Sequence, residues 1–506
     1  DKTLLYRLTG LIRDNDTQVD YVGQHRVFIA PALTWKPNLD TTLTILGNYQ
    51  RDRSGWDMQF YPALGTVFPN PNGHIPSNRF LGKPGFDNYG PTQYSIGYQF
   101  EHRLSEIWTV RQNLRFAHFD NNNQIGVFGN GGPGFGLQPD MRTYVRYGDF
   151  AQSNLDGFAV DNQAQAKFNT GLVNHTLLLG VDYQHSRFRD FGQSYDAAPI
   201  DIFDPDYSLP VTPGDPYQDT HQKQSQTGIY VQDQMKFDRW VLNLGGRYDW
   251  SKIASNDVLF GTSAEQHDSA STGRAGLLYK FDNGVAPYVS YATSFLPLLG
   301  TDASLQPFKP ETGRQYEVGV KYQPPGTRAL FTVGAFDLKR QNVLTMDPLD
   351  PNFSKQSGEI QSRGIEVEAA ASLASGWDVK AAYTYLDTKF TENDDGTVGN
   401  TPWNVPKHRV ALWADYTFRS GPLAGFGLGG GLRYQSRTFG DDANTFTVPG
   451  FAVADAAIHY DWKNYRFAIN ARNLFDKEYV AGCYDFSFGC FYGERRRVVA
   501  SLRYRW

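Results

Sequence analysis

The chain has 506 residues, a net charge of −5 at pH 7 and a pI near 6.1, so it lacks the basic charge typical of proteins that bind nucleic acid. No window holds the roughly 18 consecutive apolar residues of a membrane-spanning helix, which excludes a helical membrane protein. The mean hydropathy of −0.50 still permits a membrane β-barrel, because the lumen and loops of a large barrel are wet.

Aromatic residues make up 15% of the chain, which contains 30 Tyr and 35 Phe beside 50 Gly. Aromatic girdles and glycine-rich strands give transmembrane β-barrels this composition. Soluble β-propellers are also rich in aromatic residues and glycine, so composition leaves both architectures open. The order of strands and connections has to decide between them.

Alternation of apolar and polar residues with a period of two predicts strands along the chain. In 94–101 and again in 315–322, tyrosines and aliphatic residues alternate with polar residues. In 425–435 the apolar residues alternate with glycines, and 497–506 alternates strictly to the last residue. Aromatic residues recur at the ends of these segments, as interfacial girdles require.

The expected connections between strands alternate between long and short. The long ones are 14–25, 51–93, 119–156, 188–225, 252–270, 296–312, 341–357, 391–404, 438–449 and 475–494. The short ones include 36–40, 103–106, 238–239, 281–284, 323–327 and 461–464. A propeller would instead repeat every four strands. We therefore predict an all-β fold, a transmembrane antiparallel up-and-down β-barrel of about 20 strands with long outer loops and short periplasmic turns, as one domain over 1–506.

Several segments resemble the barrel of TonB-dependent siderophore receptors. They are 228–234 (GIYVQDQ), 244–250 (LGGRYDW), 281–295 (FDNGVAPYVSYATSF), 315–322 (QYEVGVKY), 358–368 (GEIQSRGIEVE), 405–418 (VPKHRVALWADYTF) and 473–484 (NLFDKEYVAGCY), with weaker similarity at 6–13 and 109–117. The motif NLFDKEY is typical of the whole receptor class. Together with a cysteine pair in the last outer loop, it resembles the branch that imports ferric hydroxamate siderophores such as ferrichrome.

This resemblance implies a bacterial outer-membrane transporter that is driven by the TonB complex and is not an enzyme. The family has a 22-stranded barrel preceded by a plug domain and a coupling box. We expect 1–506 to correspond to the barrel, with the plug, the coupling box and about two N-terminal strands absent from this sequence. A passive porin-like diffusion channel is the alternative from another class.

Cys483 and Cys490 are the two cysteines of the chain, and they lie in a loop expected to face the oxidising exterior. A disulfide between them is therefore predicted. The bridge could shape an aromatic loop over the ligand, or it could simply stabilise that loop. Both interpretations stay open at this point.

A ferric trihydroxamate is neutral or weakly cationic, so its site needs aromatic walls and a few hydrogen bonds, whereas a tris-catecholate would call for clustered cations. Phe60 and Phe128 fall near family positions whose rings contact the siderophore. The candidate ligand-binding residues are Trp56, Phe60, Tyr61, Phe128, Phe191, Tyr195, Tyr484 and Phe486. Asn130 stands where the resemblance implies a tyrosine, so a linear hydroxamate such as ferrioxamine is an alternative ligand.

The siderophore's own oxygens should hold the iron(III), so no metal site and no directly bound cofactor are expected. The expected partners are the ferric hydroxamate, the TonB complex, outer-membrane lipid and lipopolysaccharide, and a phage or colicin, but no nucleic acid. Loop 119–156 contains no counterpart of the family's second disulfide, so phage or toxin contacts there do not carry over.

Overall fold

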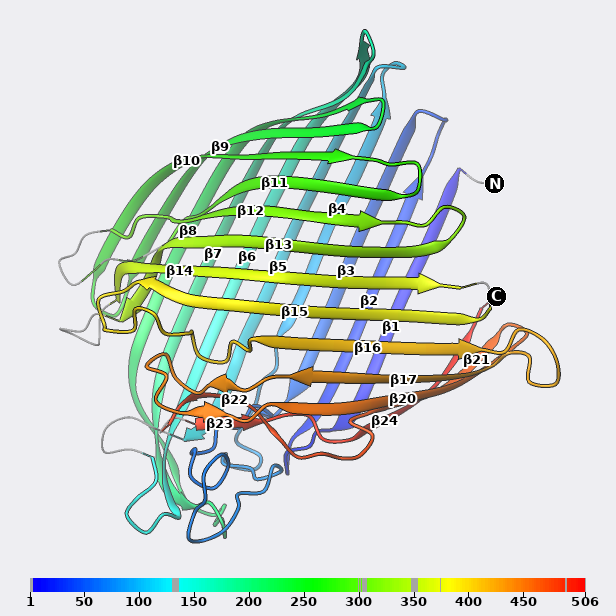
Figure 1. The fold of residues 1–506 in the computed structure, drawn as a ribbon. Coiled ribbons are helices and arrows are strands. Elements are labelled where there is room, and N and C mark those ends of the chain that lie inside the picture. The colour runs from blue at the N-terminus through cyan, green and yellow to red at the C-terminus, as the bar shows by residue number, and fades with distance from the viewer. Residues whose placement is uncertain are drawn as a thin grey trace.

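The computed structural model describes residues 3–129, 136–298, 300, 302, 307–346, 354–373, 375–486 and 489–505. Within these ranges, 20 strands form one sheet, and no helix is long and apolar enough to cross a membrane. Each strand of the sheet pairs antiparallel with the next in chain order. The predicted up-and-down architecture is therefore confirmed (Figure 1).

The strands of the sheet are β1 (Leu4–Asp16), β2 (Gly23–Trp35), β3 (Thr41–Ser54), β4 (Thr92–Arg103), β5 (Trp108–Gly129), β6 (Thr143–Thr170), β7 (Val173–Asp201), β8 (Val211–Phe237), β9 (Trp240–Asp257), β10 (Thr262–Tyr279), β11 (Val285–Leu296), β12 (Glu311–Tyr322), β13 (Arg328–Met346), β14 (Ser354–Ser372), β15 (Trp377–Glu392), β16 (His408–Thr417), β17 (Phe426–Gln435), β20 (Phe451–Trp462), β21 (Tyr465–Arg472) and β24 (Arg497–Tyr504). Two short hairpins, β18 (Thr438–Phe439) with β19 (Thr447–Val448) and β22 (Val480–Asp485) with β23 (Gly489–Tyr492), lie outside it. Both chain ends lie at the rim with the short turns (Figure 1).

The exterior of the sheet carries an apolar band with aromatic residues at both of its edges. On β12, the exposed residues Tyr316, Val318, Val320 and Tyr322 share one face. About six residue steps of about 3.4 Å each span roughly 20 Å, close to the ~25 Å apolar height of outer-membrane barrels. The alternation predicted for 315–322 therefore separates a lipid-facing side from a lumen-facing side.

Strands β5 to β8 continue well beyond the apolar band on the outer side, which corrects part of the loop prediction. The expected loop 119–156 contains the end of β5 and the start of β6, and 188–225 contains the end of β7 and the start of β8. Beyond the membrane there is no lipid to require an apolar residue at every second position. The backbones of neighbouring strands still pair there, but their side chains are mostly polar. The strands therefore persist where the alternation that predicts them is lost.

Charged and polar side chains on the other face line the lumen, where they are paired across strands. Arg247 on β9 bridges Asp182 on β7 and Asp249 on its own strand, with guanidinium–carboxylate distances of 3.0 and 2.6 Å. The Tyr230 hydroxyl on β8 donates to Asp161 on β6 at 2.7 Å. This paired lining leaves the barrel centre without an apolar core.

Buried apolar side chains gather at the outer end of the barrel instead, where the connections pack against one another. The clusters are Tyr61, Ile75, Leu81, Tyr144, Ile200 and Ile202; Ala63, Phe446, Val448, Cys483 and Cys490; and Val19, Val22 and Phe80. Each cluster joins segments that are far apart in sequence. The outer end is therefore a packed assembly rather than a set of independent loops.

Candidate ligand-binding site

A disulfide-bonded hairpin stands at the centre of the outer assembly. Cys483 on β22 and Cys490 on β23 are directly opposite each other and form a disulfide, as predicted. Both cysteines are fully buried, and they pack with Ala63 and Val448. The bridge thus lies inside the loop assembly and fixes the pairing of the short strands.

The connection between β3 and β4, here called outer loop 55–91, docks onto this hairpin through its backbone. The Tyr61 amide donates to the Cys490 carbonyl at 2.8 Å, and the Cys490 amide donates back to Tyr61 at 2.6 Å. Gly489 makes the approach possible, because it has a φ of 135° and a Cβ there would lie 2.6 Å from the Tyr61 carbonyl oxygen. No other residue type fits this position without moving the loop.

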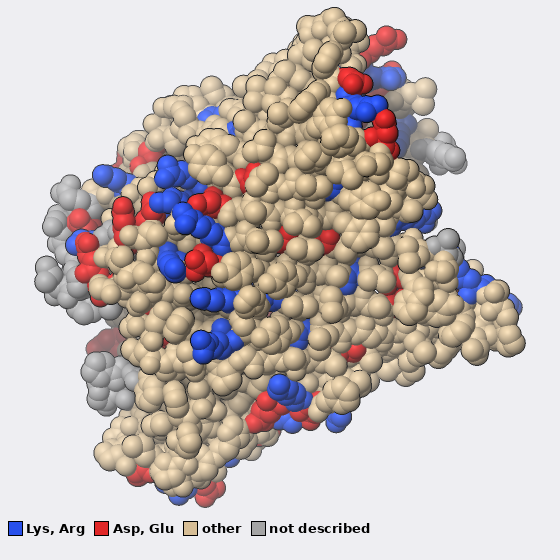
Figure 2. All heavy atoms as spheres, viewed as in Figure 1, with Lys and Arg blue, Asp and Glu red and all other residues tan. Residues whose placement is uncertain are grey.

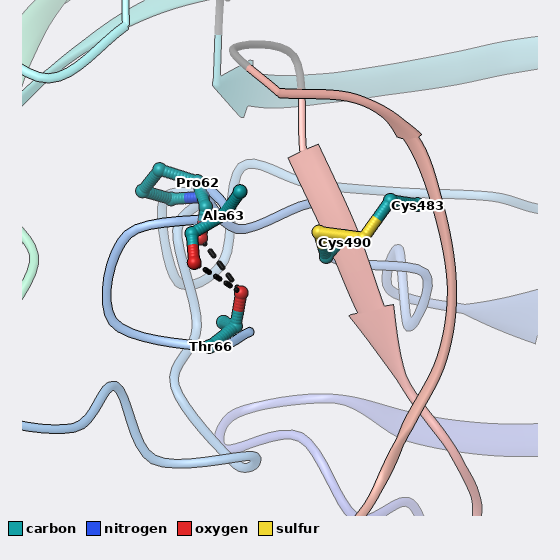
Figure 3. The surroundings of a disulfide bond; sticks show 5 residues. All are labelled: Pro62, Ala63, Thr66, Cys483 and Cys490. Carbon is teal, nitrogen blue, oxygen red and sulfur yellow. Dashed lines mark hydrogen bonds between the residues drawn. A yellow bond between two sulfur atoms is a disulfide. The ribbon is translucent and has the colours of Figure 1, made fainter. Parts of the chain in front are cut away.

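A tight turn in outer loop 55–91 packs beside the disulfide (Figure 3). The Thr66 hydroxyl donates to the carbonyl oxygens of Pro62 at 2.8 Å and Ala63 at 3.3 Å, which closes the turn. The Ala63 amide in turn donates to the Phe486 carbonyl of the hairpin at 3.3 Å. Backbone hydrogen bonds and apolar contacts thus hold outer loop 55–91 against the disulfide-bonded hairpin (Figure 3).

The NLFDKEY motif holds the base of the disulfide hairpin together through hydrogen bonds and an ion pair. The Asn473 side chain is buried and accepts from the Lys477 amide while donating to the Glu494 carbonyl, so it closes the chain at the base of the hairpin. Asp476 then accepts two bonds from Arg495, at 3.0 and 2.9 Å. The motif therefore shapes the base from which the hairpin projects.

Glu478 connects this base to outer loop 55–91. Its carboxylate accepts from Arg495 at 2.6 Å and from the Ser77 hydroxyl at 2.7 Å, and it lies 2.6 Å from the His74 ring. The Tyr492 hydroxyl donates to the Ile75 carbonyl at 2.6 Å on the same side. The two segments are thus joined by charges as well as by packing.

The hydrogen bonds and charges in this network shift the pKa values of its acids. The side-chain bond from Arg495, followed by the Arg496 amide, holds the pKa of Asp476 well below its usual value. Burial raises the pKa of Glu478, but bonds from Ser77 and His74 and the Arg495 charge outweigh it, so the net shift is downward. Both carboxylates are therefore ionised at neutral pH.

A second interaction joins outer loop 55–91 to the tips of β6 and β7. The buried Arg146 donates to the carbonyls of Leu81 at 2.9 Å, Gly82 at 3.1 Å and Ala198 at 3.0 Å. Burial lowers the pKa of this guanidinium to about 10. Burial also raises the pKa of the nearby Asp87 to about 7, although the Lys83 and Val127 amides and the Arg146 charge oppose the shift.

Two of the predicted ligand-binding rings are exposed on the disulfide hairpin. Tyr484 is 52% exposed and Phe486 is 43% exposed. Tyr484 packs on Trp403, with ring centroids 4.9 Å apart, and Phe486 packs on Phe68 and Phe446 at 5.8 and 5.7 Å. These rings present aromatic surface on a rigid support.

Four further predicted rings are half-buried within the outer assembly. Their partners are Tyr89 for Trp56 at 5.5 Å, Phe491 for Phe60 at 6.0 Å, Phe150 for Phe191 at 6.2 Å and Phe86 for Tyr195 at 5.8 Å. The structure therefore brings Phe60 to the disulfide hairpin and Tyr195 to outer loop 55–91. Phe191 packs on Phe150 within the sheet of β6 and β7.

Tyr61 and Phe128 differ from the other predicted residues. Tyr61 is 1% exposed, and its hydroxyl donates to the Arg79 carbonyl, so its ring supports the loops and presents no surface here. Burial also raises its pKa strongly. The side chain of Phe128 and the whole of Asn130 lie outside the described residues.

Several residues of the assembly are absent from the sequence-based prediction. Trp403, which extends the surface of Tyr484, follows no motif that marks it. The ionic network could have been predicted from the sequence. Asp476 and Glu478 of NLFDKEY come just before the hairpin, and the basic run 495–497 comes just after it, so the two ends of the hairpin carry opposite charges. Arg146 gives no signal, because nothing in its neighbourhood predicts burial.

The chemical groups at the surface of the outer assembly suit an organic ligand. Exposed rings on a rigid hairpin offer apolar contact, and nearby backbone groups and hydroxyls offer hydrogen bonds. Over the ranges that the structure describes, no group of three or more His, Cys, Asp or Glu side chains could hold a metal ion.

Comparisons with known proteins place this architecture in a family. The model of the family described as "TonB dependent receptor-like, beta-barrel" matches residues 34–474. The ferrichrome outer membrane transporter/phage receptor of Escherichia coli (strain K12) is 39% identical, over 100% of this chain and 70% of that protein. The ferrioxamine receptor of Yersinia enterocolitica is 36% identical, over 99% of this chain and 70% of that protein.

Solved structures show the same fold. The siderophore receptor PiuA from Acinetobacter baumannii superposes with a TM-score of 0.87 at 22% identity, over 99% of this chain and 77% of that one. The ferric-catecholate import receptor Fiu from E. coli K12 also gives 0.87, at 20% identity, over 100% of this chain and 78% of that one. The chain therefore belongs to the TonB-dependent receptor family and is a β-barrel of the bacterial outer membrane.

Proposed function

We propose that this protein is an outer-membrane receptor that imports ferric hydroxamate siderophores with energy from TonB. The observation that carries the proposal is similarity over the full chain to receptors named for two hydroxamates, ferrichrome at 39% and ferrioxamine at 36% identity. The proposed cargo is the intact complex, in which the siderophore's oxygens hold the iron(III). A passive porin is the weaker hypothesis, since none of these relatives is one.

The outer assembly supports a weakly charged, organic cargo. Tyr484 and Phe486 are exposed beside a hairpin that a disulfide, a backbone bridge and an ionic network hold in place. A rigid aromatic surface costs little side-chain entropy when a ligand binds. Of the predicted ligand residues, we propose Tyr484, Phe486 and Phe60 as those nearest the cargo.

A titration decides whether the cargo is a cyclic or a linear hydroxamate. Purified protein is titrated with ferrichrome, ferrioxamine B and a ferric catecholate while tryptophan fluorescence is followed. We expect saturable quenching by one hydroxamate and none by the catecholate. Unselective sugar flux in liposomes together with no response to any ferric complex would favour the porin instead.

A matched pair of variants assigns the quenching to the proposed surface. Tyr484→Ala removes an exposed ring of the hairpin, whereas Tyr465→Ala removes an exposed ring of the lipid-facing girdle. We expect at least tenfold weaker binding for Tyr484→Ala and unchanged binding for Tyr465→Ala. Equal affinities for the two would contradict the assignment.

Two relatives suggest further partners. The name of the E. coli relative includes a phage receptor, and one solved structure of this fold is a complex with pyocin S2. We propose that a phage or bacteriocin also uses the outer end of this barrel. Protection of cells by excess ferric hydroxamate would link such binding to the same site.

A further inference from the structure

A threonine, a histidine and an aspartate form a hydrogen-bonded chain on the exterior of β6, β7 and β8. The Thr170 hydroxyl lies 2.7 Å from Nε2 of His175, and Nδ1 of the same ring lies 2.6 Å from the Asp233 carboxylate. Because a carboxylate only accepts, Nδ1 carries the proton of the neutral ring and Nε2 accepts from the threonine. Among the histidines that the structure describes, only His175 bonds a hydroxyl through one ring nitrogen and a carboxylate through the other. This is the order of a nucleophile, its base and an orienting acid.

The chain of three residues begins at the level of the inner aromatic girdle. Thr170 pairs with Val173 across the turn between β6 and β7, and the registers of β7 with β8 and of β8 with β9 place this pair level with Phe237 and Trp240. Both rings are exposed on the exterior, and such rings mark the level of the lipid headgroups. Thr170, which is also exposed, therefore lies where the acyl esters of inner-leaflet phospholipids are found.

Asp233 lies within the apolar band, where a carboxylate is costly. Its neighbours across the strands are Leu177 and Leu244, and on the face drawn in Figure 2 the charged side chains lie mostly toward the two ends of the strands. The Asp233 side chain is 20% exposed, and its Oδ1 is buried without a hydrogen-bond partner among the described residues. Ionisable residues in a membrane are expensive and as a rule functional. The bond that this carboxylate does make orients the ring of His175.

The turn next to Thr170 offers free hydrogen-bond donors. Gly171 and Leu172 form this turn, and neither backbone amide bonds another backbone group in the part of the chain that the structure describes. Backbone amides beside a nucleophile stabilise the oxyanion that develops on an attacked carbonyl. The turn therefore adds the fourth component of an acyl-transfer site.

A hollow farther along the same face of β6 fits an acyl chain. Its volume is about 500 Å³, and the residues that line it include Phe100, Val110, Ala164, Leu179 and Val181. About six residue steps of about 3.4 Å each separate Ala164 from Thr170, a distance of roughly 20 Å along the strand. An ester held at Thr170 can therefore lay its acyl chain along β6 toward the bilayer centre.

We propose that this exterior site hydrolyses an acyl ester of inner-leaflet glycerophospholipids, an activity separate from the import of cargo. The Thr170 oxygen attacks the ester carbonyl while Nε2 of His175 takes the hydroxyl proton. The bond between the carbonyl carbon and the glycerol oxygen breaks, and His175 gives the proton to that oxygen, so a lysophospholipid leaves and the acyl group stays on Thr170. Water then attacks this acyl ester with His175 as base, which releases a fatty acid and returns the proton to Thr170.

The test uses the purified full chain in vesicles of phosphatidylethanolamine and phosphatidylglycerol, with fatty acid and lysophospholipid measured by mass spectrometry. Thr170→Val removes the nucleophile with little change of shape, and Asp233→Asn removes the orienting charge. Thr41→Val is the matched control. Thr41 lies at the same rim and bonds Nδ1 of His102 at 2.9 Å, in a pair to which the described residues add no carboxylate.

We expect the native protein to release fatty acid, with about 100-fold less release for Thr170→Val and about tenfold less for Asp233→Asn. Release should return in Thr170→Ser and stay at the native rate in Thr41→Val. Ether-linked phospholipids, which have no carbonyl to attack, should stay intact.

Release that is equal in the native protein and Thr170→Val, or absent from both, would overturn the proposal and leave these residues a structural hydrogen-bond chain. Folding of each variant is checked by heat-modifiable gel mobility. If Thr170→Val does not fold, native protein treated with p-nitrophenyl palmitate is digested and its peptides are weighed. An acyl group on the peptide that contains Thr170 supports the proposal, and its absence from that peptide contradicts it.

Discussion

Burial of Asp87 links the packing of outer loop 55–91 to pH. Its pKa is raised to about 7, so the folded state favours the neutral acid. The stability that the folded state gains from the neutral acid is fully present below about pH 4, the pKa of this carboxyl in the unfolded chain. It is lost as the pH rises through about 7. A shift of this size is worth at most roughly 4 kcal/mol. We expect amide exchange in 80–90, corrected for the intrinsic rate, to accelerate between pH 5 and pH 8.

The variant Asp87→Asn supplies the control for this effect. An amide keeps the acceptor for the Lys83 amide, which now bonds Oδ1 at 3.1 Å, and it cannot ionise. We expect the variant to match the native protein below about pH 4 and to exchange more slowly than it at pH 8, with a difference that grows between these two pH values. A pH dependence that survives in Asp87→Asn would assign the effect to another group.

Arg495 connects the two acids of the NLFDKEY motif to outer loop 55–91. Arg495→Ala removes its bonds to Asp476, Glu478 and Ser77. Because the guanidinium is about one-third exposed, we expect a loss of only about 1–2 kcal/mol. Amide exchange in 74–79 and 476–492 should accelerate about tenfold.

Arg497→Ala is the matched control for this loss. Arg497 is the second residue after Arg495, and its one ion pair among the described residues is with Glu494, at 3.4 Å. Its removal should leave exchange in the hairpin unchanged. If the two variants behave alike, the network contributes nothing beyond a general effect of charge.

Single residues show which parts of the site are predictable from sequence. Tyr61 and Tyr484 are both aromatic residues in outer loops, and sequence gives no reason to separate them. Their roles differ because Tyr61 pairs with Cys490 through its backbone, which turns its ring into the loop core, whereas Tyr484 projects from the hairpin. That distinction depends on contacts between segments more than 400 residues apart, which no local pattern contains.

Among the elements, we expect the stability of the disulfide hairpin to depend on its covalent bridge. Closing a loop of eight residues is worth about 2.5 kcal/mol in the chain-entropy model. In Cys483→Ala/Cys490→Ala we expect faster amide exchange in β22 and β23 and at Tyr61, because the bridge to Tyr61 needs an ordered β23. The strands β20 and β21 of the same sample serve as the internal control.

Ligand binding distinguishes the two interpretations of that bridge. If the bridge shapes the surface of Tyr484 and Phe486, ferric hydroxamate affinity should fall along with the protection of the hairpin. If affinity stays at the native value while protection falls, the bridge only stabilises the loop. The same titration by tryptophan fluorescence measures both proteins.

The wall of the barrel depends on its internal ion pairs. Arg247→Met leaves Asp182 and Asp249 buried without their cation, and uncompensated buried charge costs about 3–5 kcal/mol. We expect heat-modifiable gel mobility to report a lower unfolding temperature. Arg274→Met is the control, since the exposed Arg274 bonds the neutral Gln232 and, within the part of the chain that the structure describes, no acid. Equal shifts in both variants would contradict this role for Arg247.

Elements were predictable where lipid constrains the sequence. Lipid demands an apolar residue at every second position of β12, so its alternation defines both the strand and its orientation. The outer ends of β6 and β7 lie beyond the lipid, and Tyr144 and Ile200 pack there against outer loop 55–91. Segments such as 143–156 look like loops in the sequence although they pair with β7 along most of their length. Backbone hydrogen bonds leave no side-chain signature there.

At the scale of the whole molecule, alternation of short and long connections fixes which rim faces the exterior. The disulfide hairpin, outer loop 55–91 and the long ends of β5 to β8 all lie at one rim, and both termini lie at the other (Figure 1). An oxidising exterior accounts for a disulfide at the rim with long connections. Because the 20 strands form one sheet, the orientation of any one strand in the membrane sets the orientation of all the others.

Labelling of single cysteines on intact cells tests this orientation. The two native cysteines are bonded to each other and do not react. Asp215→Cys lies at the outer end of β8, and Asn464→Cys lies in the short turn between β20 and β21, both at exposed positions. We expect a membrane-impermeant maleimide to label Asp215→Cys on intact cells and Asn464→Cys only after the membrane is permeabilised. The reverse pattern would place the aromatic hairpin in the periplasm, where it could not receive a siderophore from the medium, and would refute the proposed import function together with the orientation.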